Sequence, residues 1–160
     1  MRNGLAGIGF VDCGVRRSAS ENGSVCNHSN KDGTQRREVS IDGKRITTVD
    51  IHAHCAVPDA LAVLGYPTEN TKLLMTDTSE RISTMDAQGI DISALSINPY
   101  WYHVDVDAAE EIIRIQNESL AEICAAHSDR FVAFASIALQ HPKLAVEQIE
   151  YGIKVLGLRG

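Results

Sequence analysis

The sequence predicts an α/β fold with a parallel sheet, because stretches with strand character alternate with stretches of helical periodicity. Three predicted strands, centred near residues 48, 93 and 135, are separated by segments long enough for crossover helices. Strands joined in this way run parallel, with right-handed connections. Their carboxyl ends then lie on one side of the sheet, which is where such folds place their chemistry.

The composition is that of an ordinary globular chain. Hydrophobic residues make up 44% of the 160 residues and charged residues 22%, which is typical of one domain. The formal net charge is −6 and the basic residues form no stripe, so neither nucleic acid nor an anionic membrane is expected as a partner. No apolar run approaches the roughly 18 residues of a membrane span. Four cysteines without regular spacing indicate neither a disulfide framework nor a zinc knuckle.

Residues 1–36 differ from the rest of the chain. They are rich in Ser, Asn and Gly and offer little to bury, which predicts a disordered leader. A weak apolar patch at residues 4–11, behind Arg2, resembles the remnant of an export signal, but Asp12 interrupts it. We therefore expect a cytoplasmic protein, with a periplasmic one as the alternative if the leader derives from an export signal. The folded domain is expected over residues 37–160.

A β-hairpin is expected at the start of this domain. Asp42-Gly43 separates Glu38–Ile41 from the run that begins at Lys44. Asp-Gly between alternating runs is a strong signal for a two-residue turn. The second arm is expected to continue through Val49 into the histidine pair described below.

The remaining elements follow a strand–helix order. Asp77-Thr-Ser-Glu80 has the spacing of a capping box and Gly89 is a good terminator, so a helix is expected between them. Pro142 suits the first turn of another helix. The expected elements are a short helix at 59–65, strands at 90–97 and 131–139, helices at 107–127 and from 142 to 157, and a new element from 158.

Two histidines one residue apart, His52 and His54, end the first predicted strand. Side chains at positions i and i+2 of a strand share a face, so both imidazoles can converge on one metal ion at about 2.0–2.1 Å. The alternative is two histidines satisfied by backbone groups. Cys55 is either a further ligand or a small apolar residue in the turn. Asp50, on the same face as His52, is either a partner of a ligand or a capping residue.

An aromatic loop, Asn98-Pro-Tyr-Trp-Tyr-His103, follows the second of these strands. Asn98, Tyr100 and Trp101 are candidates for the wall of a pocket over a planar acid, because aromatic rings with polar tips suit such substrates. The alternative is a loop that packs on neighbouring helices. Since the loop follows the carboxyl end of a strand, we expect it to share a rim with residues 140–142.

Six motifs lie in register over residues 45–160. They are Asp50-Ile-His-Ala-His-x-x-x-Pro, Arg81-Ile-x-x-Met-Asp-x-x-Gly-Ile-Asp, Asn117-Glu-x-Leu-Ala, Ser128-Asp-Arg-Phe-Val-Ala-Phe-Ala, Leu139-Gln-x-Pro-x-x-Ala-Val-Glu and Lys154-x-Leu-Gly-Leu-x-Gly. Together they resemble the metal-dependent amidohydrolase superfamily. Within it they are similar to the amidohydrolase-related branch typified by aminocarboxymuconate-semialdehyde decarboxylase.

The resemblance implies the N-terminal part, about three to four βα units, of a (β/α)8 TIM barrel with a divalent metal, usually zinc, at its carboxyl rim. His52 and His54 would supply two ligands. The other ligands and an acid/base histidine would come from the second half of the barrel, beyond residue 160. The arginine that binds substrate carboxylate in the decarboxylase has no counterpart between Gly65 and Asp77. Residues 37–160 are about half of the roughly 250 residues of such a barrel, so we expect a fragment or a truncated gene product.

Three functions remain open from the sequence. The first is a metal-dependent carbon–carbon lyase (decarboxylase) or hydrolase that acts on a small carboxylated substrate, with this chain inactive on its own. The second is metal-dependent hydrolysis of an amide, lactone or phosphoester on the same scaffold. The third is a non-catalytic truncated pseudo-enzyme, or half of a homo-oligomer in which another copy completes the barrel.

Overall fold

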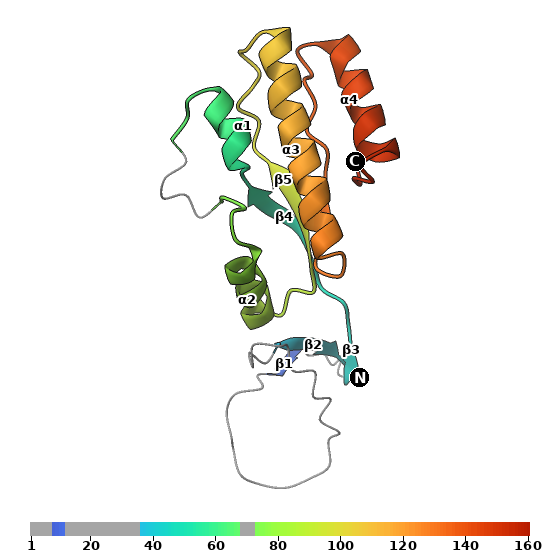
Figure 1. Cartoon of the computed structure of the whole chain (residues 1–160). Coiled ribbons are helices and arrows are strands. Elements are labelled where there is room, and N and C mark those ends of the chain that lie inside the picture. The colour runs from blue at the N-terminus through green and yellow to red at the C-terminus, as the bar shows by residue number, and fades with distance from the viewer. Residues whose placement is uncertain (1–7, 12–35, 68–72) are drawn as a thin grey trace, which may run out of the picture. The chain divides into compact units, whose positions relative to one another are not determined.

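The computed structural model describes residues 8–11, 36–67 and 73–160, and the chain divides into two compact units (Figure 1). The first unit runs to Val49 and also takes in Ser79–Asp91, whereas the second comprises Asp50–Thr78 and Ile92–Gly160. Within the described ranges, no helix combines the length and the apolar character needed to cross a bilayer. Apart from residues 8–11 and 36, the predicted disordered leader lies outside the described residues.

The first unit holds a three-stranded antiparallel sheet in the order β1-β2-β3. β1 (Ile8–Val11) pairs with β2 (Glu38–Ile41), which pairs with β3 (Lys44–Arg45). The turn between β2 and β3 places Asp42 and Gly43 at φ 50° and 73°. These are the left-handed values of the type I′ turn that Asp-Gly favours, so the predicted hairpin is confirmed.

The second arm of this hairpin is shorter than the sequence predicts. β3 ends at Arg45. The Ile46 N–H still donates to the Val39 carbonyl oxygen of β2 (3.0 Å), and the chain leaves the ladder after it, before β4 (Val49–Cys55) begins. The Thr48 N–H donates to Asp91 Oδ2 (2.7 Å), and the Thr48 carbonyl oxygen accepts from the Asp91 N–H (3.1 Å). The prediction of one continuous arm is wrong because these bonds take the place of strand pairing at Thr48.

Helix α2 (Thr78–Gln88) ends just before Gly89, as predicted, and most of it belongs to the first unit. Asp91, which follows, is buried. Its Oδ1 accepts from the guanidinium groups of Arg36 and Arg45 at 2.5 and 2.6 Å. This buried carboxylate therefore joins two segments that lie far apart in the sequence of the first unit.

The second unit is the α/β part of the chain, with an open sheet of described strands in the order β4-β5-β6; Figure 1 shows β4 and β5 side by side. β5 (Ile92–Ile97) pairs in parallel with β6 (Phe131–Ala133). The predicted α/β fold with parallel βα units is confirmed. Its helices are α1 (Pro58–Val63), which follows β4, α3 (Val106–Ala126), which joins β5 to β6, and α4 (Pro142–Lys154).

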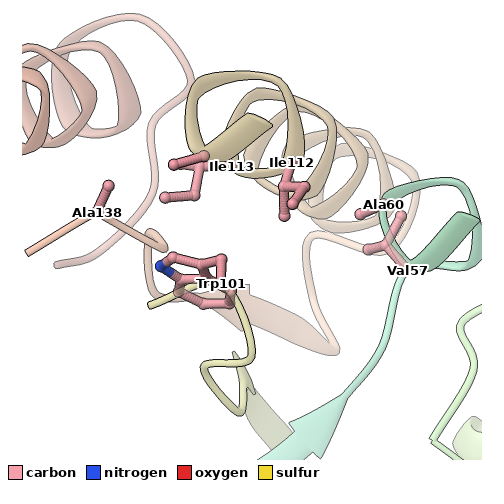
Figure 2. Packing of buried hydrophobic residues seen from close by; sticks show 7 residues of the cluster. Val57, Ala60, Trp101, Ile112, Ile113 and Ala138 are labelled. Atoms are coloured by element: carbon pink, nitrogen blue, oxygen red, sulfur yellow. The ribbon is translucent and has the colours of Figure 1, made fainter. Parts of the chain in front are cut away.

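A hydrophobic core lies where α1, α3 and the loop after β5 meet (Figure 2). The Trp101 ring faces Ile112 and Ile113 of α3 and is only 3% exposed. Its Nε1–H donates to the Ile137 carbonyl oxygen (3.0 Å), which satisfies the buried polar end of the ring. The buried members of the cluster are Val57, Ala60, Trp101, Ala109, Ile112, Ile113 and Ala138.

The sequence predicts a strand over 131–139, but β6 covers only its first three residues. From Ser136 onward, helix side chains bind the backbone instead of a neighbouring strand. Asn117 of α3 donates to the Ser136 carbonyl oxygen (3.0 Å) and accepts from the Ser136 N–H (2.8 Å). Gln148 of α4 accepts from the Ala138 N–H (2.8 Å). The prediction is wrong after β6 because these side chains satisfy the buried backbone groups.

The last described residues add to the free edge of β6. The Arg159 N–H donates to the Ala133 carbonyl oxygen (2.8 Å), and the Ala135 N–H donates to the Gly160 carbonyl oxygen (2.5 Å). These two bonds hold residues 159 and 160 beside the end of β6. The new element predicted from residue 158 is therefore extended chain beside β6.

Candidate functional site

His52 and His54 lie next to each other on β4, as the alternation of strand residues predicts. Their ring centroids are 4.6 Å apart and the ring planes meet at 87°. A ligating imidazole places its centroid about 3.2 Å from the metal, so the centroids of two ligating rings lie about 4.5–5.2 Å apart for ligand–metal–ligand angles of about 90–109°. The observed spacing therefore fits the binding of one ion by both rings.

Three polar contacts surround the pair. His54 Nδ1 lies 3.4 Å from Oγ of Ser96, on β5. The Cys55 thiol is buried and donates to the Ser96 carbonyl oxygen (3.5 Å). Asp50 Oδ1 accepts the backbone N–H of His52 (3.0 Å). These contacts match the alternatives in which Cys55 is a small packed residue and Asp50 caps the backbone.

The described residues contain no group of three or more His, Cys, Asp and Glu side chains placed to hold a metal ion. Catalytic zinc sites normally keep three protein ligands. The pair thus fits a divalent metal in its donor atoms and its spacing. In the part of the chain that the structure describes, it falls short in the number of ligands.

A pocket of about 180 Å³ is linked to the pair through Ser96, which lines the pocket and contacts His54, although neither histidine lines it. The pocket lies at the carboxyl end of β5, against the segment that follows β6. Tyr102 and Phe134 give it aromatic walls and are 48% and 38% exposed. Its size restricts it to a small ligand. The lining residues are Ser96, Ile97, Pro99, Trp101, Tyr102, Phe134, Ala135, Ser136 and Ile137.

The three aromatic-loop candidates are placed differently from one another. Trp101 belongs to the hydrophobic core and also lines the pocket. Tyr100 packs against that core, and its hydroxyl accepts from Gln116 Nε2 (2.8 Å); burial raises the pKa of this phenol. Asn98 is exposed and is not among the residues that line the pocket. Their roles in substrate binding stay predictions.

The two loops expected to share a rim do meet. Gln140 Nε2 donates to the Trp101 carbonyl oxygen (2.8 Å). His141 Nε2 lies 3.4 Å from the Val104 carbonyl oxygen. The loop after β5 and the turn before α4 are therefore held together, which confirms the prediction from the parallel order of the strands.

Sequence reasoning missed two residues of this region, Ser96 and Phe134, whereas Tyr102 lies in the aromatic loop that it singled out. Ser96 carried a usable signal, because it is a polar residue near the carboxyl end of a mostly apolar strand, where such folds place their chemistry. Phe134 carried none, since it lies inside an apolar run that predicts complete burial.

No family model matches the chain. Among curated proteins, the chain is 37% identical over 120 residues to gamma-resorcylate decarboxylase from Rhizobium sp. (strain MTP-10005), in an alignment that covers 70% of this chain and 37% of that protein. This region of the chain belongs to the amidohydrolase-related decarboxylase family. The recognition made from the six motifs is thereby confirmed.

Solved structures of amidohydrolase-related decarboxylases match over the same share of the chain. The 2,6-dihydroxybenzoate decarboxylase from Rhizobium is 35% identical with a TM-score of 0.59, and the match covers 70% of this chain and 36% of that one. A dihydroxybenzoic acid decarboxylase from Polaromonas sp. JS666 is 28% identical with the same TM-score and coverage, and it holds manganese and the inhibitor 2-nitroresorcinol. The chain thus spans little more than a third of the length of these relatives. The comparisons give no support to zinc, the metal expected from the resemblance.

Proposed function

We propose that this chain supplies the first βα units of a metal-dependent decarboxylase that acts on a small carboxylated aromatic acid. The observation that carries the proposal is the His52–His54 pair, whose ring spacing suits one ion, in a chain 37% identical to gamma-resorcylate decarboxylase. Because the described residues supply only this pair of ligands, we expect the reaction to need a complete barrel. The hydrolytic alternative gains no support, since the relatives above are decarboxylases.

The ion proposed for this pair is a divalent cation. Imidazole nitrogen suits zinc, whereas the Polaromonas relative holds manganese. When bound, such a cation supplies positive charge that orients the oxygen atoms of a carboxylated substrate. His52 and His54 would hold it from β4, so both ions belong in the test.

The pocket beside the pair is proposed to hold the ring of the acid. Tyr102 and Phe134 present aromatic surface to it, and offset or edge-to-face contacts with a substrate ring are favourable. Because Ser96 lines the pocket and contacts His54, a ring bound there lies next to the histidine pair. A substrate of one ring suits the pocket size.

Loss of CO2 from an aromatic acid needs a proton. The proton is added to the ring carbon that bears the carboxylate, and the carbon–carbon bond then breaks while its electron pair stays in the ring. A general acid delivers this proton. No His, Asp, Glu or Lys is found among the described residues that line the pocket, so we expect the general acid to come from elsewhere in a complete barrel.

The proposed metal role is tested by titrating Mn²⁺ and Zn²⁺ separately into the chain and into the His52→Ala/His54→Ala double variant, with calorimetry as the readout. We expect weak binding of one ion by the wild-type chain and a loss of at least about tenfold in the double variant. His103→Ala, in the exposed loop after β5, is the matched control and should bind like wild type. Equal binding by the double variant, or no binding by the wild-type chain, would contradict the proposal.

A further inference from the structure

Ser96 occupies the position that joins the histidine pair to the pocket. Its hydroxyl oxygen lies 3.4 Å from His54 Nδ1, and its carbonyl oxygen accepts from the thiol of Cys55. Two consecutive residues of β4 thus contact one residue of β5. The same serine lines the pocket, so whatever orients it also sets the distance between the imidazoles and a bound ligand.

The strand that carries Ser96 is well held. Ser93, Ala94 and Leu95 are in parallel register with the whole of β6, and the Leu95 carbonyl oxygen also accepts from the Phe134 N–H (3.0 Å). Pairing of this kind fixes the Cα and Cβ atoms of Ser96, so only rotation about χ1 moves its hydroxyl oxygen. This hydroxyl can therefore fix the plane of a ring that it contacts on the neighbouring strand.

We propose that Ser96 is a positioning residue for metal binding, in which its Oγ accepts the Nδ1–H of His54. A neutral imidazole carries one proton, so a proton held at Nδ1 leaves the Nε2 lone pair for the ion. Metal-binding histidines usually donate their second ring N–H to an oxygen acceptor in this way. The inference rests on the proposed function, because it assigns Ser96 to the same metal site.

The contact between Ser96 Oγ and His54 Nδ1 is expected to shorten when an ion binds. A distance of 3.4 Å is long for a bond from a ring N–H to a hydroxyl oxygen. Hydrogen bonds in ligand-free sites are often long and tighten when the ligand binds. Losing an acceptor of this kind typically costs about 10–100-fold in metal affinity, which is large enough to measure.

The test compares an isosteric pair, Ser96→Thr and Ser96→Val, of which only the first keeps a hydroxyl group; Ser96→Ala gives the simplest truncation. Ser93→Ala is the matched control, because Ser93 lies on the same strand and is buried, but an odd number of residues away and hence on its other face. Two readouts are used on the full chain. One is Mn²⁺ affinity by calorimetry, and the other is the His54 tautomer from the ¹⁵N shifts of its ring without metal.

We expect Mn²⁺ to bind about 10–100-fold more weakly to the Val and Ala variants, with the Thr variant and Ser93→Ala close to wild type. The ring shifts of His54 should move away from the Nδ1–H form only where the hydroxyl is lost. If the Ala variant does not fold, the Thr and Val variants decide. Unchanged affinity in the Val variant, or an unchanged tautomer, overturns this inference and leaves the metal pair intact. Absence of Mn²⁺ binding by the wild-type chain overturns the proposed function and this inference together.

Discussion

At the scale of single residues, Asp91 shows how a buried carboxylate organises the first unit. Burial alone would raise the pKa of Asp91, but the Thr48 N–H and the guanidinium groups of Arg36 and Arg45 outweigh it and lower the pKa. A folded-state pKa below the unfolded value of about 3.9 stabilises the fold above that value. The contribution is lost as the pH falls through the folded pKa of Asp91.

We therefore expect Asp91→Asn to lower the free energy of unfolding by about 2 kcal/mol at pH 7, measured by urea denaturation. The difference from wild type should shrink as the pH falls below about 4, because protonation removes the same charge from wild type. Glu38→Gln is the control, since Glu38 pairs with Arg45 at a more exposed position and should cost less than about 1 kcal/mol. A pH-independent difference would contradict the role of the charge.

Some of these residue roles could be predicted and others could not. The His52–His54 pair follows from strand alternation, which is a local rule. The partners of Asp91 and His54 could not be predicted, because Thr48 and Ser96 lie 43 and 42 positions away in the sequence. Periodicity does not report which distant side chains a fold brings together.

At the scale of elements, polar residues on the buried sides of helices determine where the strands end. Gln116 interrupts the apolar periodicity of α3, yet it is completely buried and donates to the Tyr100 hydroxyl. Asn117 and Gln148 likewise bind backbone that follows β6. The helices were predicted to within a few residues because their periodicity is local. The end of β6 was not, because it depends on side chains from two helices.

Asn117→Ala tests this explanation. The substitution leaves the N–H and carbonyl oxygen of Ser136, a buried residue, without the partner that Asn117 provides. We expect the free energy of unfolding to fall by about 2–3 kcal/mol, measured by urea denaturation with circular dichroism. Glu118→Ala on the same helix removes exposed contacts with Arg114 and with the Tyr151 hydroxyl and should cost less than about 1 kcal/mol. Equal losses in the two variants would contradict the explanation.

At the scale of the whole molecule, the second unit leaves apolar side chains uncovered. Val146 and Ile153 lie seven residues apart on α4, and hence on one side of it, and are 59% and 47% exposed. Val155, just after the helix, is 67% exposed. A stripe of this kind favours association when it is not covered. The sequence predicted the order of strands and helices in this unit. It did not predict which apolar side chains of α4 are exposed, because exposed and buried apolar residues recur with the same helical period.

We expect Val146→Lys/Ile153→Lys to reduce concentration-dependent association of the chain, measured by light scattering, without lowering the free energy of unfolding. Both positions are already exposed, so the folded state loses little apolar contact. Ala125→Lys/Ala126→Lys adds the same charge at exposed positions of α3 and serves as the control. If the control reduces association equally, net charge and not the α4 stripe is responsible.

The two imidazoles stand only one residue apart on β4, and this limits what an ion can do for folding. A cation bound by His52 and His54 closes a loop of only one intervening residue. It therefore removes little conformational entropy from the unfolded chain. A structural zinc ion is different, because its binding is coupled to the folding of its domain. We therefore expect an ion held by this pair alone to add little to the stability of the second unit.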